Sequence, residues 1–154
     1  MPERVKYAKK VVENANEFAA GLSNFGYVVA GEAPTFTETQ QVWVDAGDTD
    51  TALEWARRLR TANIRVTVVP LPSAGGRSGL RMGVQELTRM GMSTNEMKIV
   101  SGLVARCLVS NSNPYVIRNE VIELTRDFSD VKFTSGWPKN DLIDIVNKKI
   151  KATS

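Results

Sequence analysis

The sequence predicts an α/β domain in which a small antiparallel or mixed sheet of three to four strands carries helices on one face. Apolar residues recur at helical spacing in several stretches, short runs rich in valine lie between them, and glycines and prolines mark the turns. Interleaved strands and helices are typical of a sheet covered by helices. With 154 residues, 42% of them hydrophobic, the chain can bury one core. We therefore expect one domain over residues 1–133 and a C-terminal helical extension over residues 134–154.

The N-terminal half begins with a predicted helix that Gly26 ends. Strands are expected at Tyr27–Val29 and at Val42–Ala46, on either side of a polar loop. Asp50 is the expected cap of a helix that runs from Thr51 to Ala62. The apolar positions of the first helix are Val5, Ala8, Val11, Val12, Ala15, Phe18, Ala19 and Leu22.

Prolines, a capping box and a cap followed by proline mark the later elements. The predicted strands are Ile64–Val69, ended by Pro70 and Pro72, and the run from about Gly79 to Val84. The predicted helices run from Ser93 to about Val109, from Asn113 to about Asp127, and from Asp141 to Lys149.

The composition excludes several kinds of chemistry. The chain has no histidine and one cysteine, Cys107, so it cannot build a Ser-His or Cys-His nucleophile, a zinc site or an internal disulfide. We interpret Cys107 as a core residue. A net charge of +3 is too mild and too dispersed to predict a nucleic-acid surface. Without a signal peptide after Met1 or an apolar run long enough to span a membrane, we expect a cytoplasmic protein.

The most informative stretch is Gly79-Leu80-Arg81-Met82-Gly83, which follows a loop rich in glycine and serine. Burying the Arg81 guanidinium among apolar neighbours would be costly unless an anion met it, and its planar fork suits a carboxylate. The glycines would let a ligand approach closely. The alternative is a strand arginine whose stem packs while its head reaches water. The residues alone leave both interpretations open.

The same stretch, followed by Glu86-Leu87-Thr88-Arg89-Met90-Gly91-Met92, resembles the closing signature of the small domain of serine hydroxymethyltransferases. That signature reads S-G-[IL]-R-[ILMV]-G, three residues, then [IL]-T-x-[RM]-G-[FM]. The resemblance covers about residues 5–131. Further similar segments follow in the expected order: Tyr7–Ala15, Phe25–Val29, Val42–Asp45 and Ala62–Val66.

The resemblance implies the small domain of a fold-type I enzyme that uses pyridoxal phosphate (PLP). It implies that Arg81 binds the carboxylate of an amino-acid substrate, with Ser73 and Ser78 as further candidates at the rim of the pocket. It implies no catalytic or cofactor-binding residue in this chain, because the lysine that holds the cofactor belongs to the family's large domain; no metal ligand is expected either. With Met1 interpreted as a true start, we expect one subunit of a split, heteromeric transferase or aldolase. A separate large-domain subunit would then hold PLP, and the first helix would dock against it.

Three departures from the family concern the one-carbon acceptor. Val69 stands about where the family has an asparagine that contacts the pterin, and the loop Ser73–Arg77 is shorter than its counterpart. Thr39-Gln40 replaces the family's D-N-H. These changes argue against tetrahydrofolate and favour an aldehyde acceptor, as in threonine transaldolases.

A different class of function stays open. Small α/β modules also bind amino acids without catalysis, in which case Arg81 would bind an effector in a regulatory or scaffold domain. Other polar residues have simpler interpretations: Asp48 and Asp50 form a turn and a helix cap, and Trp43 belongs to the core. Arg77 and Arg89 are interpreted as exposed arginines.

Overall fold

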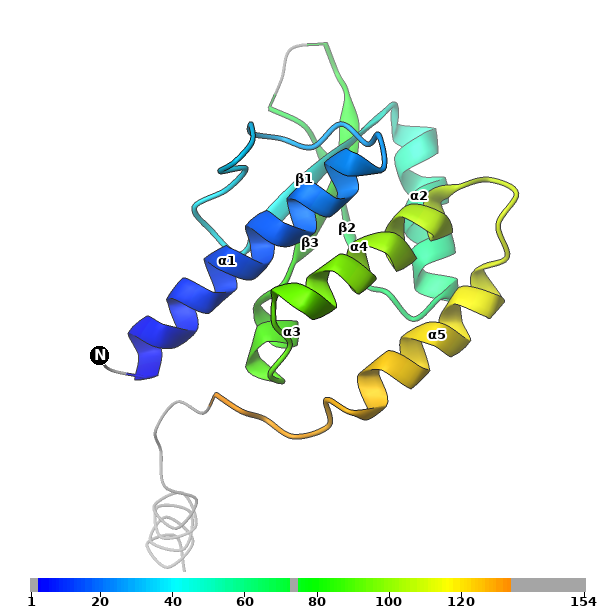
Figure 1. The fold of residues 1–154 in the computed structure, drawn as a ribbon. Helices are drawn as coiled ribbons and strands as arrows, with labels where there is room; N and C mark the ends of the chain where they lie inside the picture. The colour runs from blue at the N-terminus through cyan, green and yellow to red at the C-terminus, as the bar shows by residue number, and fades with distance from the viewer. Residues whose placement is uncertain (1–2, 73–74, 134–154) are drawn as a thin grey trace, which may run out of the picture.

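The computed structural model describes residues 3–72 and 75–133, and within them a three-stranded antiparallel sheet lies against helices (Figure 1). The predicted α/β class is confirmed. The strands are β1 (Gln41–Gly47), β2 (Thr67–Pro70) and β3 (Ser78–Gly83). The helices are α1 (Glu3–Asn24), α2 (Thr49–Thr61), α3 (Gln85–Arg89), α4 (Thr94–Leu108) and α5 (Pro114–Arg126). Ser73 and the helix expected at Asp141–Lys149 lie outside the described residues.

The sheet has the order β1-β3-β2, so β3 pairs on both sides. Trp43 of β1 and Thr67 of β2 stand opposite Arg81 of β3. Because side chains alternate along a strand, one face carries the core residues and the other carries Arg81. The buried core residues of β1 and β3 are Val42, Val44, Leu80 and Met82.

Helices α1, α2 and α4 cover the core face. The buried side of α1 includes Phe18 and Leu22, and α4 packs along it. A Cβ atom built on Gly21 of α1 would lie 2.1 Å from Ser101 Oγ of α4, so glycine allows the two helices to approach this closely. Cys107 is buried in α4, as predicted.

Two sets of side-chain hydrogen bonds connect the helices to neighbouring segments. The buried Asn14 of α1 donates its amide to Thr88 Oγ1 (2.8 Å) and to the Met92 carbonyl (3.0 Å), on either side of the end of α3. Arg58 of α2 donates to the Cys107 carbonyl near the end of α4 (2.7 Å) and to the Ser112 carbonyl in the turn that follows (2.8 Å). A guanidinium there satisfies carbonyls that the helix leaves free.

Several predicted boundaries were wrong, each for a local reason. Tyr27–Val29 forms only an isolated bridge, from Val29 to Val44. The strand expected from Ile64 starts at Thr67, opposite Arg81, and the three residues before it are not paired with β3. Helix α2 begins at Thr49, with Asp48 in place of Asp50 as its N-cap. The short helix α3 was not predicted.

Candidate functional site

Arg81 lies at the middle of β3, on the face of the sheet that the helices do not cover. Leu80 and Met82 point into the core, whereas the Arg81 side chain is exposed. Of the two interpretations that the sequence leaves open for the guanidinium, burial among apolar residues is thus excluded, and the Arg81 side chain reaches the surface. The alternation of the strand turns Arg81 away from those neighbours.

Glycines flank Arg81 on its own face, and they do different things. A Cβ atom on Gly79 would lie 2.2 Å from the Val44 carbonyl oxygen and 3.0 Å from Leu71 Cδ2, so the backbone of β1 and the Leu71 side chain crowd this position. A Cβ atom on Gly83 would meet only the end of the Gln85 side chain. On this face of the sheet, backbone and side-chain atoms therefore leave no room for a side chain at position 79, whereas position 83 is bounded only by the movable Gln85 side chain.

Among the described residues, the Arg81 guanidinium has no hydrogen-bond or ion-pair partner, and this distinguishes it from Arg77 and Arg89. Arg77 Nε donates to Asp45 Oδ2 at 2.7 Å, and Arg89 pairs with Glu86 at 3.8 Å. The hydrogen bond from Arg77 lowers the pKa of Asp45, and the Gly47 amide lowers it further. Arg77 is therefore engaged, and Arg81 is available to an external anion.

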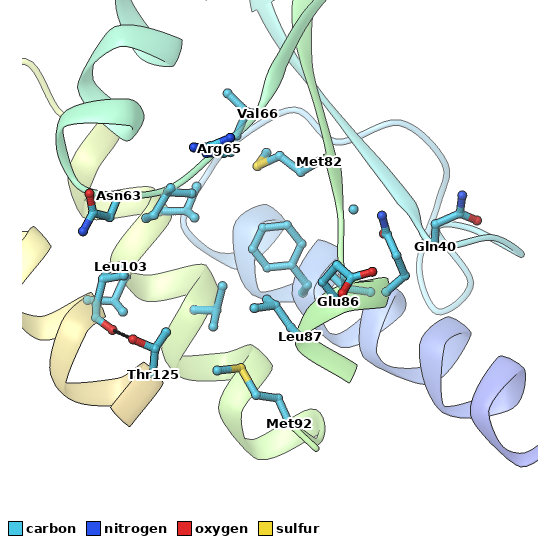
Figure 2. A pocket seen from close by; sticks show the side chains of 18 of the residues that line it. Gln40, Asn63, Arg65, Val66, Met82, Glu86, Leu87, Met92, Leu103 and Thr125 are labelled. Carbon is cyan, nitrogen blue, oxygen red and sulfur yellow. Dashed lines mark hydrogen bonds between the residues drawn. The ribbon is translucent and has the colours of Figure 1, made fainter. Parts of the chain in front are cut away.

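A cavity of about 650 Å³ includes Arg81 in its lining. Figure 2 shows it from close by, with Asn63 and Arg65 beside the end of α2 and Leu87 on α3. Its apolar wall includes Phe18, Met92, Leu103 and Leu124, and its polar residues include Gln41, Arg65 and Thr67. This volume is in the range of small-molecule sites.

A second cavity, of about 580 Å³, is lined by Trp43. The loop before β1 contributes Val28 and Phe36, and the segment after β2 contributes Leu71 and Pro72. Trp43 itself is half-buried on the uncovered face, and its indole Nε1 donates to Gln41 Oε1 at 3.0 Å. Its assignment to the core was wrong, because position 43 alternates with the buried Val42 and Val44.

Other predicted site residues lie elsewhere. Ser78 is buried at the start of β3, and its Oγ lies 2.8 Å from Thr49 Oγ1 at the start of α2. Arg65, in contrast, was not singled out from the sequence although it lines the Arg81 cavity. The signal was the alternation of apolar and polar residues from Ile64 to Val68, which becomes informative once the strand register is known.

Within residues 3–72 and 75–133, no three His, Cys, Asp or Glu side chains gather into a group that could hold a metal ion. None of the helices in these ranges is long and apolar enough to cross a membrane.

No family model matches the chain, but individual proteins do. The serine hydroxymethyltransferase of Staphylothermus marinus is 34% identical over 149 residues, which cover 92% of this chain and 34% of that protein. The serine hydroxymethyltransferase of Pyrobaculum aerophilum is 38% identical over 131 residues, which cover 83% and 30%. The chain thus spans about a third of the length of these relatives.

A solved structure agrees with these matches. The crystal structure of L-threonine transaldolase from Pseudomonas fluorescens superposes with a TM-score of 0.82 and 27% sequence identity, covering 92% of this chain and 33% of that one. The chain therefore resembles the C-terminal domain of the serine hydroxymethyltransferases, and its fold matches the small domain of a fold-type I PLP enzyme.

Proposed function

We propose that this chain is the small domain of a PLP-dependent transferase or aldolase that acts at the Cα–Cβ bond of an amino acid, and that Arg81 binds the substrate carboxylate. The observation that carries the proposal is the Arg81 guanidinium on the uncovered face of the sheet, which has no partner among the described residues and lies within a motif that resembles the family signature. An exposed guanidinium between two strands can meet a carboxylate with two parallel hydrogen bonds.

When bound, PLP supplies an electron sink for the charge that develops at Cα. The contribution of Arg81 is orientation. By holding the carboxylate at two points, it fixes which bond at Cα faces the cofactor. The neighbouring strands support this role, because Trp43 and Thr67 stand on either side of Arg81 and limit where its stem can lie.

In this proposal a separate large-domain subunit provides the lysine and holds PLP. Among the described residues, neither the cavity that Arg81 lines nor the one that Trp43 lines includes a lysine, which is consistent with that division. The relatives, of which this chain matches only about a third, support the need for a second domain. The uncovered face that carries Arg81 would then be turned toward the large domain.

We propose an aldehyde as the acceptor. Val69 stands opposite Gly79 on the face that carries Arg81. An apolar residue there leaves the polar edge of a pterin without partners, and an unmade hydrogen bond of this kind costs about 1–3 kcal/mol.

The test is to express the tagged chain together with its neighbouring reading frames and to purify what assembles. We expect a yellow complex that contains PLP and cleaves β-hydroxy amino acids. The Arg81→Ala chain should form the same complex without that activity. A purified complex that holds no PLP would contradict the proposal, and so would full activity in the Arg81→Ala complex.

A further inference from the structure

The register of the sheet brings the Trp43 side chain close to Arg81. The two residues stand directly opposite each other in β1 and β3. The Trp43 carbonyl accepts a hydrogen bond from the Ala30 amide at 2.9 Å, on the side of β1 that faces away from β3. Because the N–H and C=O groups of a strand residue point to the same side, Trp43 and Arg81 form a pair without mutual hydrogen bonds. In such pairs the Cα atoms are about 4.5 Å apart and the side chains approach most closely.

Thr67, the neighbour of Arg81 on the other side, stands farther away. The Leu71 amide donates to the opposite Arg77 carbonyl at 2.9 Å, so these two residues form a hydrogen-bonded pair. The two kinds of pair alternate along an antiparallel ladder, which makes Arg81 and Thr67 a hydrogen-bonded pair as well. The Cα atoms of such pairs are about 5.5 Å apart. The nearer neighbour of Arg81, Trp43, therefore also has the larger side chain.

The indole offers a fixed, flat surface to the stem of Arg81. Its Nε1 donates to Gln41 Oε1 at 3.0 Å, and the residue is half-buried. Glycines flank Arg81 on its own face of β3, so its own strand provides no side chain for the stem to pack against. Among the described residues, the cation–π contact is that of Lys10 with Phe133, so the guanidinium does not stack on the indole. Contact with Trp43 would therefore involve the methylenes and leave the N–H donors available to an anion.

We infer that Trp43 is a positioning residue, whose indole supports the stem of Arg81 and so holds the guanidinium in the orientation that receives the carboxylate. The inference rests on the proposed role of Arg81. An arginine that is already ordered loses less conformational freedom when it binds an anion. Trp43 therefore acts through Arg81 on the affinity for the amino acid, and it takes no part in the reaction.

The first test measures ¹⁵N relaxation of the arginine Nε groups by NMR in the full 154-residue chain. We expect Arg81 Nε to be more ordered than that of Arg60, an exposed arginine of α2. Trp43→Thr should lower the Arg81 order parameter to the level of Arg60, because threonine suits a strand but removes the flat ring. Trp43→Phe should preserve most of the order.

Thr67→Ala is the matched control, because it removes the other neighbour of Arg81 and leaves the indole in place. The Arg81 order parameter should change little in this variant. Unchanged Arg60 signals report an intact fold, and Trp43→Leu replaces Trp43→Thr if those signals shift. An Arg81 Nε as mobile as that of Arg60 in the wild type would overturn the inference, and so would equal losses of order in Thr67→Ala and Trp43→Thr.

Steady-state kinetics of the assembled complex, with L-threonine as the probe, separates this inference from the proposed function. Trp43→Thr should raise KM by about twofold to tenfold with little change in kcat, because the cost of ordering Arg81 falls on substrate binding. Trp43→Phe should restore most of the affinity. Full activity in the Arg81→Ala complex contradicts the proposed function, whatever the relaxation data show. An inactive Arg81→Ala complex, combined with an unchanged KM in Trp43→Thr, contradicts only the role of Trp43.

Discussion

At the scale of single residues, the surroundings of each arginine decide what it can do. Arg77 is held by Asp45, and Arg89 pairs with Glu86. Arg81 has a strand on each side, and no acidic side chain among the described residues pairs with it. Because the three arginines lie within thirteen residues of sequence, only the alternation of β3 and the positions of the acidic residues distinguish them.

Arg81→Ala is expected to abolish turnover by the assembled complex while leaving assembly and cofactor absorbance intact. Each charge-assisted hydrogen bond to the carboxylate is worth about 1.5–3 kcal/mol, and without them the substrate is free to rotate. Arg81→Lys should rescue little, because an ammonium cannot reproduce the bidentate fork. Steady-state kinetics of the complex measures both effects. Arg77→Ala and Arg89→Ala are the comparisons, with smaller losses expected; an unchanged Michaelis constant and rate in Arg81→Ala would refute the carboxylate role.

Gly79→Ala is expected to destabilise the fold. Its Cβ atom would lie 2.2 Å from the Val44 carbonyl oxygen, so β1 would have to shift. Overpacking of this kind costs about 1–3 kcal/mol, and in a chain of this size each kcal/mol lowers the melting temperature by roughly 2–4 °C. Gly83→Ala is the control, because the Gln85 side chain can move aside. Thermal unfolding followed by circular dichroism should show a larger drop in melting temperature for Gly79→Ala than for Gly83→Ala. Equal melting temperatures for the two variants would mean that β1 can shift without loss of stability.

At the scale of elements, helices whose ends carry capping residues in the sequence were predictable. Strands, which depend on hydrogen bonds to a distant neighbour, were not. The Ser93–Glu96 capping box and the Asn113-Pro114 start both lie where expected, and α1 ends just before Gly26. Tyr27–Val29 has a strand-like composition, but its hydrogen-bond partner is set by the whole sheet. Five residues of α3 are too few to show a helical period.

The candidate site divides in the same way. Arg81 was found because a short motif surrounds it. Arg65 was missed because its place in the cavity lining depends on how the segment before β2 packs against the rest of the fold. The exposure of Arg81 was one of two open interpretations, since the sequence shows which residues adjoin it along the chain and not which face of the sheet they share.

The pairing of Arg77 with Asp45 ties the segment after β2 to β1 and is expected to make stability depend on pH. The Arg77 hydrogen bond lowers the pKa of Asp45 in the folded state. This pairing therefore contributes its full stability above the unfolded-state pKa of about 3.9, and the contribution is lost as the pH falls through the lower folded-state pKa. Since the Arg77 side chain is 49% exposed, solvent screening should keep this contribution small.

Asp45→Asn should reveal this contribution in urea unfolding between pH 2 and pH 7. The variant should be less stable than the wild type near pH 7, and the difference should shrink below about pH 4. Arg77→Ala should produce the same narrowing. A difference that stays constant over the whole range would assign the stability to something other than the charge of Asp45.

At the scale of the whole molecule, one face of the sheet is covered by helices and the other carries the candidate site. The covered face holds a continuous core from α1 through β1 and β3 to α4. The uncovered face holds Arg81 between Trp43 and Thr67. In the proposed enzyme this face meets the large domain, so the complete site exists only in the assembly.

The chain alone is therefore expected neither to bind PLP covalently nor to be active. Incubation with PLP, borohydride reduction and mass spectrometry should find no stoichiometric adduct on a lysine of this chain. The assembled complex, treated identically, should carry the adduct on its large-domain subunit. A stoichiometric PLP adduct on a lysine of the isolated chain would contradict the proposal that a separate subunit holds the cofactor.

The assembled complex is also expected not to need tetrahydrofolate. Val69 gives a pterin no polar partner on the face that carries Arg81, and each unmade hydrogen bond costs about 1–3 kcal/mol. Serine turnover measured with and without tetrahydrofolate should show no large difference, whereas an added aldehyde should accelerate consumption of the amino acid. A large stimulation by folate would show that the pterin is bound by other residues.

The buried side-chain amide of Asn14 connects α1 to the segment that follows β3. Its two hydrogen bonds reach Thr88 and Met92, the segment that directly follows β3, while Tyr7 of the same helix donates to the Gln85 carbonyl at 2.9 Å. Three hydrogen bonds thus connect α1 to the chain just beyond Gly83. A force that pulls on α1 is transmitted to the end of the strand that holds Arg81. A helix that enters from a neighbouring domain would therefore couple the movement of that domain to the position of the guanidinium.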